Sequence, residues 1–231
     1  MMLKKMTIRS WTVLRALPAT TGVVALLGAA ALWLSAQPLH DQVEFIRQNS
    51  SNLHNLRHRM WWTVFTSGLV VDELPVLFGI GAVAAALGAV EWRWGSARAL
   101  GVFCFGHVAA TLITEGVVWL MGHADLPTPC ARDHDVGISY GLVATVAYLM
   151  SLVGERTRRY GLRALAMALA AAWAVNQELA DAGHLVALGL GALAARSRWA
   201  RSRGRRPAAG PVAKAASATP PLGTESLRPS P

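Results

Sequence analysis

The sequence predicts an all-α membrane protein, a bundle of six transmembrane helices with both termini in the cytoplasm. Hydrophobic residues make up 53% of the 231 residues, and charged residues only 15%. The apolar residues come in blocks of about twenty, the length of a helix that crosses a bilayer. These blocks lack the alternation of a membrane barrel. Helices are therefore the structure that satisfies the backbone in lipid.

Six apolar blocks are candidate spans. The first ends in "LSAQP", whose small residues also occur at signal-peptide cleavage sites. Its apolar run is long for a signal peptide, and Leu34 suits the cleavage pattern poorly, so we expect an uncleaved helix. The fifth block is the shortest. The expected spans are residues 17–35, 74–90, 99–121, 136–152, 162–173 and 179–195.

Basic residues in the connections predict the orientation. With six spans, four basic groups fall on one side, which is cytoplasmic by the positive-inside rule. The net charge of +9 therefore flanks membrane spans, which favours lipid headgroups over nucleic acid as its partner. We expect a multi-pass plasma-membrane protein. The basic groups are Lys4, Lys5, Arg9 and Arg15; Arg93 and Arg98; Arg156, Arg158, Arg159 and Arg163; and Arg196, Arg198, Arg201, Arg203, Arg205 and Arg206.

The chain divides into one membrane domain and two polar ends. A basic cytoplasmic lead covers 1–16, the transmembrane domain 17–195 and a basic tail 196–231. The tail is rich in Pro, Ala, Ser and Gly and has no apolar period, so we expect disorder there. Residues 36–70 form a long outer loop that mixes charge with aromatics, which is typical of segments lying at the bilayer interface.

A serine and a histidine are the candidate catalytic pair. Ser139 lies in "GISYG", but no strand precedes it, which excludes the elbow of soluble serine hydrolases. It lies about four residues into the fourth span, and His184 about five residues into the sixth. Both spans run inward from the outer side, so the two side chains share one depth and suit a nucleophile–base pair. The alternative is a packing serine bonded to its own helix. A histidine within a span favours function.

Small residues on both of these spans predict that the two helices approach closely. Side chains of this size let membrane helices touch backbone to backbone, as a short bond between serine and histidine requires. The stripe on the fourth span is Gly137, Gly141 and Ala144, and that on the sixth is His184, Ala187 and Gly191.

Three stretches resemble the rhomboid intramembrane serine protease family. "GISYGLVA" is similar to the nucleophile motif, and "GHLVALGLGAL" to the helix that bears the histidine. "GAVEWRWGSARAL" is similar to the turn after the second helix, with Glu91 and Gly95 in place. The resemblance covers residues 59–195. It implies a six-helix rhomboid-like bundle with a water-filled cavity open to the outside. In it a dyad of Ser139 and His184 would cleave transmembrane substrates near their ends, without a cofactor.

The sequence departs from that family at the groups that hold the oxyanion. Rhomboids usually carry a His and an Asn in the second helix, and Pro75 and Gly79 stand at those positions here. Losing one such donor costs roughly a hundred- to a thousandfold in rate. Tyr140 replaces the glycine after the nucleophile, where we expect it to crowd the substrate, and Ala187 replaces a glycine beyond the histidine.

Three other polar residues are candidate auxiliaries. Asp181 precedes His184 by three residues, where it would orient the imidazole as in a triad or serve only as a helix cap. Glu115 lies near the depth of the pair and shares a face with His107, and we expect Glu115 to face the cavity because a carboxylate in a span is costly. The third loop matches no closed metal template, so no metal site is expected.

Two functions remain open from the sequence. The first is a rhomboid-like intramembrane serine endopeptidase that cleaves membrane-anchored proteins. The second is a catalytically inactive rhomboid-like protein that binds transmembrane clients, which the missing oxyanion donors favour. A small transporter has only Glu115 and His107 in its favour and lacks the paired broken helices of such proteins.

Overall fold

The structure is a computed structural model that describes residues 16–70, 76–124 and 137–197. Every regular element in these ranges is a helix, which confirms the predicted all-α class. The lead and nearly all of the tail lie outside the described residues. The six longest helices match the six predicted spans, with ends that differ by a few residues. They are α2 (Pro18–Ser35), α6 (Val76–Trp94), α7 (Ser96–His123), α8 (Ser139–Val153), α9 (Leu162–Asn176) and α10 (Leu179–Ala194).

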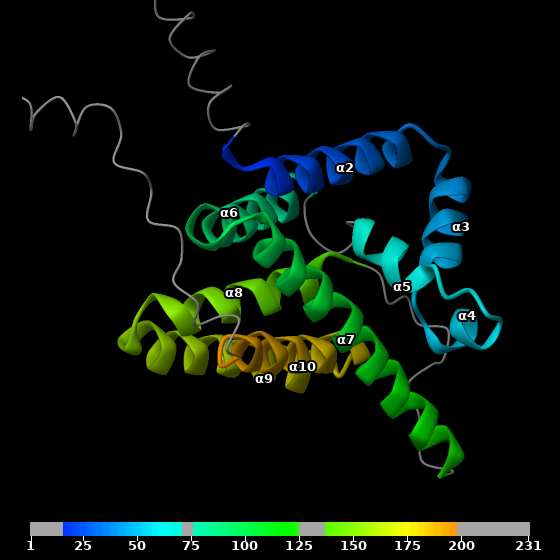
Figure 1. Ribbon diagram of the computed structural model, residues 1–231. Coiled ribbons are helices and arrows are strands. Elements are labelled where there is room, and N and C mark those ends of the chain that lie inside the picture. The colour runs from blue at the N-terminus through cyan, green and yellow to red at the C-terminus, as the bar shows by residue number, and fades with distance from the viewer. Residues whose placement is uncertain (1–15, 71–75, 125–136, 198–231) are drawn as a thin grey trace, which may run out of the picture.

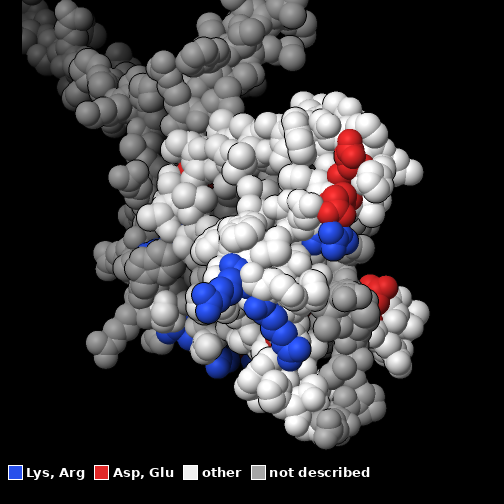
Figure 2. All heavy atoms as spheres, turned by 90° about the vertical axis from the view of Figure 1, so that its right-hand side faces the viewer, with Lys and Arg blue, Asp and Glu red and all other residues white. Residues whose placement is uncertain are grey.

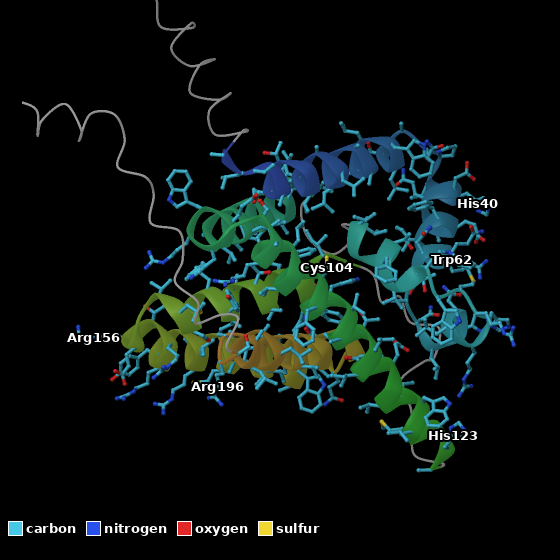
Figure 3. The ribbon with its side chains drawn as sticks, viewed as in Figure 1. His40, Trp62, Cys104, His123, Arg156 and Arg196 are labelled. Atoms are coloured by element: carbon cyan, nitrogen blue, oxygen red, sulfur yellow. The ribbon has the colours of Figure 1, made fainter. Side chains whose placement is uncertain are left out.

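These six helices run back and forth between two ends of the bundle (Figure 1). One end carries the short helices that follow α2, and His40, Trp62 and His123 lie there (Figure 3). The opposite end carries the α6–α7 and α8–α9 turns, and Arg156 lies there. We call these the α3–α5 end and the arginine end.

Several of the helices suit a membrane. Three of them, α2, α6 and α7, are long and apolar enough to cross a bilayer, and α8 and α10 are shorter apolar helices. Large apolar side chains such as Leu77 and Met167 are strongly exposed, at 86% and 72%. Exposed apolar area of this kind marks a surface that contacts something other than water. The protein is therefore a membrane protein.

The core is built around α8, which packs against both α7 and α10. One apolar cluster joins α6, α7 and α8, and includes Val83, Leu87 and Tyr148. A second cluster joins α7, α8 and α10 through Tyr140 and the small residues Ala110, Ala144 and Ala187. Small side chains bring these three helices together. By contrast, α9 has no buried residue and lies at the edge of the bundle.

A single carboxylate ties α2 to the α6–α7 turn. Glu91 accepts hydrogen bonds from the backbone N–H groups of Ala19 (2.9 Å) and Thr20 (2.7 Å) and from the Thr20 hydroxyl (2.6 Å). It also accepts one from the Ser96 hydroxyl. The first N–H groups of a helix have no intrahelical acceptor and favour a negative charge. Gly95 completes the turn at φ 93°, and its N–H donates to the Glu91 carbonyl oxygen (2.8 Å).

Short helices form the segment that follows α2, where the sequence predicts an interfacial loop. They are α3 (Leu39–Asn49), α4 (Leu53–Arg57), α5 (Thr63–Thr66) and the 3₁₀ helix η1 (Ser67–Leu69). Trp61 and Trp62 are more than half exposed, at 59% and 55%. Seen from this end, the surface is largely uncharged, with a few acidic and basic groups (Figure 2). An exposed tryptophan pair on such a surface suits the headgroup region of a bilayer.

Candidate active site

The candidate nucleophile begins a helix. Ser139 is the first residue of α8, and its N-cap is Ile138. Gly137 precedes them at φ 132°, a conformation that L side chains rarely adopt. The Gly137 N–H donates to the Ser67 carbonyl oxygen at 2.9 Å, so η1 holds the chain as it enters α8. Gly137 therefore lies outside the helix, and its part in the predicted packing stripe is replaced by a part in this turn.

The candidate base has a carboxylate on one side only. His184 is the sixth residue of α10. Its Nδ1 lies 3.7 Å from Oδ1 of Asp181, which is an ion-pair distance and longer than a hydrogen bond. The other Asp181 oxygen accepts a hydrogen bond of 3.0 Å from the Asn176 amide. Both side chains of the ion pair are mostly buried, with 12% of His184 and 13% of Asp181 exposed.

The second imidazole nitrogen is buried and unused. Within the described residues, Nε2 of His184 has no hydrogen-bond partner. The bond from the Ser139 hydroxyl that a dyad requires is therefore not formed. The neighbour of His184 on α8 is instead Tyr140, whose ring meets the imidazole edge-on at a centroid distance of 5.3 Å. Because Tyr140 follows Ser139 directly, the imidazole lies beside the first turn of α8.

Tyr140 lies inside the bundle, beside the candidate base, and its crowding of a substrate stays a prediction. Its side chain is 2% exposed. A Cβ on Gly183 would collide with the phenol of Tyr140. On the other side, the ring of His107 lies at a centroid distance of 6.4 Å. The ring thus fills the space between α7 and α10, because α10 has a glycine there.

Further along α8, this helix and α10 also pack closely together. A Cβ on Gly191 would collide with the carbonyl oxygen of Ala144. Ala187, one turn earlier on α10, is fully buried. Gly141 contacts the other neighbour of α8: its Cβ would lie 2.8 Å from the Phe103 ring of α7. The predicted stripe on α8 is therefore divided, because a central helix presents small residues to two neighbours at once.

The two candidate auxiliary residues on α7, His107 and Glu115, have neighbours other than Ser139 and His184. His107 is buried, with Nε2 3.3 Å from the Ser67 hydroxyl. A Cβ on Gly68 would lie 2.7 Å from that nitrogen, so η1 packs directly on the imidazole. Glu115 is also buried, and it lines a cavity of about 420 Å³ between α4 and α7. Arg57 and Arg59 line the same cavity, whereas Ser139 and His184 do not.

Comparison with known proteins assigns the chain to a family. The sequence model of the family described as "Rhomboid-like protein" matches residues 12–205. The chain belongs to the rhomboid-like protein family. No curated protein and no solved structure gives a match.

The match covers every helix of the bundle as well as Ser139 and His184. Rhomboid proteases usually carry oxyanion donors at two positions of the second helix, where this rhomboid-like protein has Pro75 and Gly79. Gly79 is buried within α6. Pro75 lies outside the described residues.

Three residues of the site were not predicted from the sequence. Ser67 contacts His107 from 40 residues away along the chain, and Asn176 contacts Asp181 across the turn between α9 and α10. Gly183 faces Tyr140. For Gly183 a signal exists, because it precedes Ala187 by four residues and Gly191 by eight and so continues the same helix face. Ser67 and Asn176 have no such signal, since their partners are set by tertiary packing.

Proposed function

We propose that this rhomboid-like protein is an intramembrane serine endopeptidase of the plasma membrane, acting on membrane-anchored proteins. The Ser139 hydroxyl attacks the scissile carbonyl, and Nε2 of His184 accepts its proton and returns it to the leaving amine. The observation that carries the proposal is the buried Nε2 without a partner, beside the helix turn that Ser139 begins. Family membership supports it independently.

The surroundings of His184 suit a base. An imidazolium formed during the reaction would be stabilised by the Asp181 carboxylate at 3.7 Å. The Asn176 amide in turn holds that carboxylate from the end of α9. Ser139 at the start of α8 suits a nucleophile, because the first N–H groups of a helix have no intrahelical acceptors and point at a developing oxyanion. These N–H groups would replace the missing second-helix donors in part.

The proposed reaction requires a hydrogen bond from the Ser139 hydroxyl to Nε2 of His184, which substrate binding would complete. Catalytic hydrogen bonds are often long before substrate binds and shorten in the complex. The proposal requires that a movement of the Ser139 side chain or of α10 bring the hydroxyl to Nε2. The ring of Tyr140 limits that movement, because it fills the space beside the imidazole.

A fluorophosphonate probe, which reacts with activated serines, tests the proposal in reconstituted vesicles. We expect labelling of the wild type and none above background in Ser139→Ala or His184→Ala. Asp181→Asn should label at least about tenfold more slowly. Its loss should be smaller than the roughly ten-thousandfold loss when a hydrogen-bonded triad acid is neutralised, since the contact here is long.

The matched control is Ser151→Ala, which removes another serine of α8 near the opposite end of the helix. Its hydroxyl is bonded to the Ala147 carbonyl oxygen at 2.7 Å. Labelling should persist in this variant. Labelling that survives Ser139→Ala, or a folded wild type that never labels, would refute the protease.

The second candidate function is an inactive protein that binds transmembrane clients. The observation in its favour is the unformed bond at Nε2, together with a glycine where an oxyanion donor is usual. This candidate predicts that transmembrane proteins co-purify equally with wild type and with Ser139→Ala. The protease instead predicts that Ser139→Ala retains clients that the wild type cleaves and releases.

A further inference from the structure

A second cavity lies at the arginine end, far along α8 from Ser139. It has a volume of about 750 Å³ and lies between the end of α8, the start of α9 and the end of α10. One part of the cavity wall consists of charged side chains, and another part consists of apolar ones. The lining residues are Arg158, Arg159, Arg163, Arg196 and Ser151, with Leu152, Leu162, Ala192 and Ala195.

A π-helical turn places the first of these arginines. The helix η2 (Thr157–Gly161) has π geometry and runs directly into α9. Turns with π geometry are rare in proteins, and those that occur are often found at functional sites. Gly161 lets this turn pack closely on α8, because a Cβ there would lie 3.3 Å from the sulfur of Met150. Arg159 and Arg163, four residues apart, therefore face the cavity from successive turns.

Among the residues that the structure describes, basic side chains outnumber acidic ones at this cavity. Glu155 lies 3.1 Å from Arg159 and 3.9 Å from Arg158, and all three side chains are more than half exposed. Arg163 has no ion pair or hydrogen bond within the described residues. Within the described residues, the Glu155 carboxylate pairs with Arg158 and Arg159 and leaves Arg163 without a counter-charge, so these three guanidinium groups and one carboxylate carry a net positive charge that an anion would offset. The site therefore favours a negatively charged ligand.

The apolar part of the wall decides what kind of anion fits. Leu152 and Leu162 would gain nothing from a small hydrated anion, whereas hydrocarbon would cover them. The cavity borders α9, which has no buried residue and exposes Met167. We propose that this cavity binds an anionic phospholipid, with its phosphate on the arginines and its first methylene groups along the leucines. Guanidinium groups bind phosphate bidentately, and basic pockets between membrane helices bind lipid headgroups.

Native mass spectrometry of the full chain tests this site. The protein would be titrated with phosphatidylglycerol or phosphatidylcholine, and bound lipids counted. We expect phosphatidylglycerol to bind more tightly. The double variant Arg159→Gln and Arg163→Gln should bind it roughly tenfold more weakly or worse, since hydrogen bonds to charged groups are lost.

The matched control removes the same charge nearby: Arg93→Gln with Arg156→Gln, neither of which lines the cavity. Its affinity should stay within about twofold of wild type, as for screened surface charges. If the first double variant fails to fold, Arg163→Lys serves instead. It keeps the charge but lacks the planar pair of N–H donors of a guanidinium group, and it should weaken binding measurably.

Two results would overturn the site. Equal weakening in both double variants would mean diffuse attraction to a basic surface. Displacement of phosphatidylglycerol by an equal concentration of inorganic phosphate would mean a free-anion site, with no part for the acyl chains. Neither result bears on Ser139 labelling, so the lipid site and the protease fail independently.

Discussion

The Glu91 carboxylate joins three helices, because it belongs to α6 and accepts hydrogen bonds from α2 and α7. It satisfies two backbone N–H groups at the start of α2 and two hydroxyls, and its side chain is buried. Glu91→Gln replaces one acceptor oxygen with an amide donor and removes the charge that the helix start favours. A buried donor left without an acceptor costs about 1–3 kcal/mol. We expect a loss of stability of that size, measured by unfolding in mixed detergent micelles.

The control for this prediction is Glu155→Gln, a carboxylate on the surface with 69% of its side chain exposed. Surface changes of this kind stay within about 0.5 kcal/mol. If the two variants were equally stable, Glu91 would not fasten α2 to the α6–α7 turn.

At the residue scale, the sequence predicts side chains whose chemistry is costly in a membrane. His184 and Glu115 stand out because a charge or imidazole within an apolar block needs a reason, whereas Glu91 stands out only through its resemblance to the rhomboid turn. What surrounds them is harder to predict. Glu115 shares a cavity with Arg57 and Arg59 of the short segment after α2. That neighbourhood depends on the fold of 36–70, for which the sequence predicts no internal structure.

At the scale of helix pairs, Gly191 makes the sharpest prediction. Gly191→Ala would drive a methyl group into the Ala144 carbonyl oxygen, and backbone cannot yield as a flexible side chain does. Overpacking of this kind costs about 1–3 kcal/mol. We expect that loss in unfolding measurements, together with slower probe labelling, because α10 carries His184 past α8.

Gly189→Ala is the matched control on the same helix, since nothing lies within 4 Å of a Cβ there. It should be neutral or stabilising by up to about 1 kcal/mol, the usual gain of alanine over glycine in a helix. Equal loss in both variants would contradict close packing of α8 on α10 and point to a general need for glycine.

Helix ends show where apolar pattern stops being informative. The predicted fourth span begins at residue 136, whereas α8 begins at Ser139, because Gly137 at positive φ belongs to the preceding turn. Glycine is compatible with both a membrane helix and a turn, so composition cannot distinguish them. The π geometry of η2 likewise cannot be predicted from "TRRYG", because it accompanies the tertiary packing of Gly161 on Met150.

At the scale of the whole molecule, the length of the helices bears on how the chain meets the bilayer. The 28 residues of α7 span roughly 42 Å at 1.5 Å per residue, more than the hydrocarbon core. The 15 residues of α8 span roughly 22 Å, less than that core. Tilt of the long helix and local thinning around the short ones accommodate such a mismatch.

The decisive helix for a six-span topology is α9. It has no buried residue, carries Arg163 in its first turn and has only 15 residues. Together with η2 it reaches about 30 Å, enough to cross if the arginines extend to the headgroups. If α9 and α10 did not cross the bilayer, both would lie on the cytoplasmic side. The residues of the arginine end would then still be cytoplasmic. The α9–α10 turn therefore distinguishes the two arrangements.

Single cysteines on a background with Cys104→Ala and Cys130→Ser test this topology. An impermeant maleimide applied to intact cells should label Gln48→Cys in α3 and Gln177→Cys in the α9–α10 turn. Thr157→Cys in η2 should label only after permeabilisation. All three positions are exposed, so access depends on the membrane alone. Protection of Gln177→Cys beside a labelled Gln48→Cys would contradict crossing by α9 and would separate His184 from the side on which Ser139 lies.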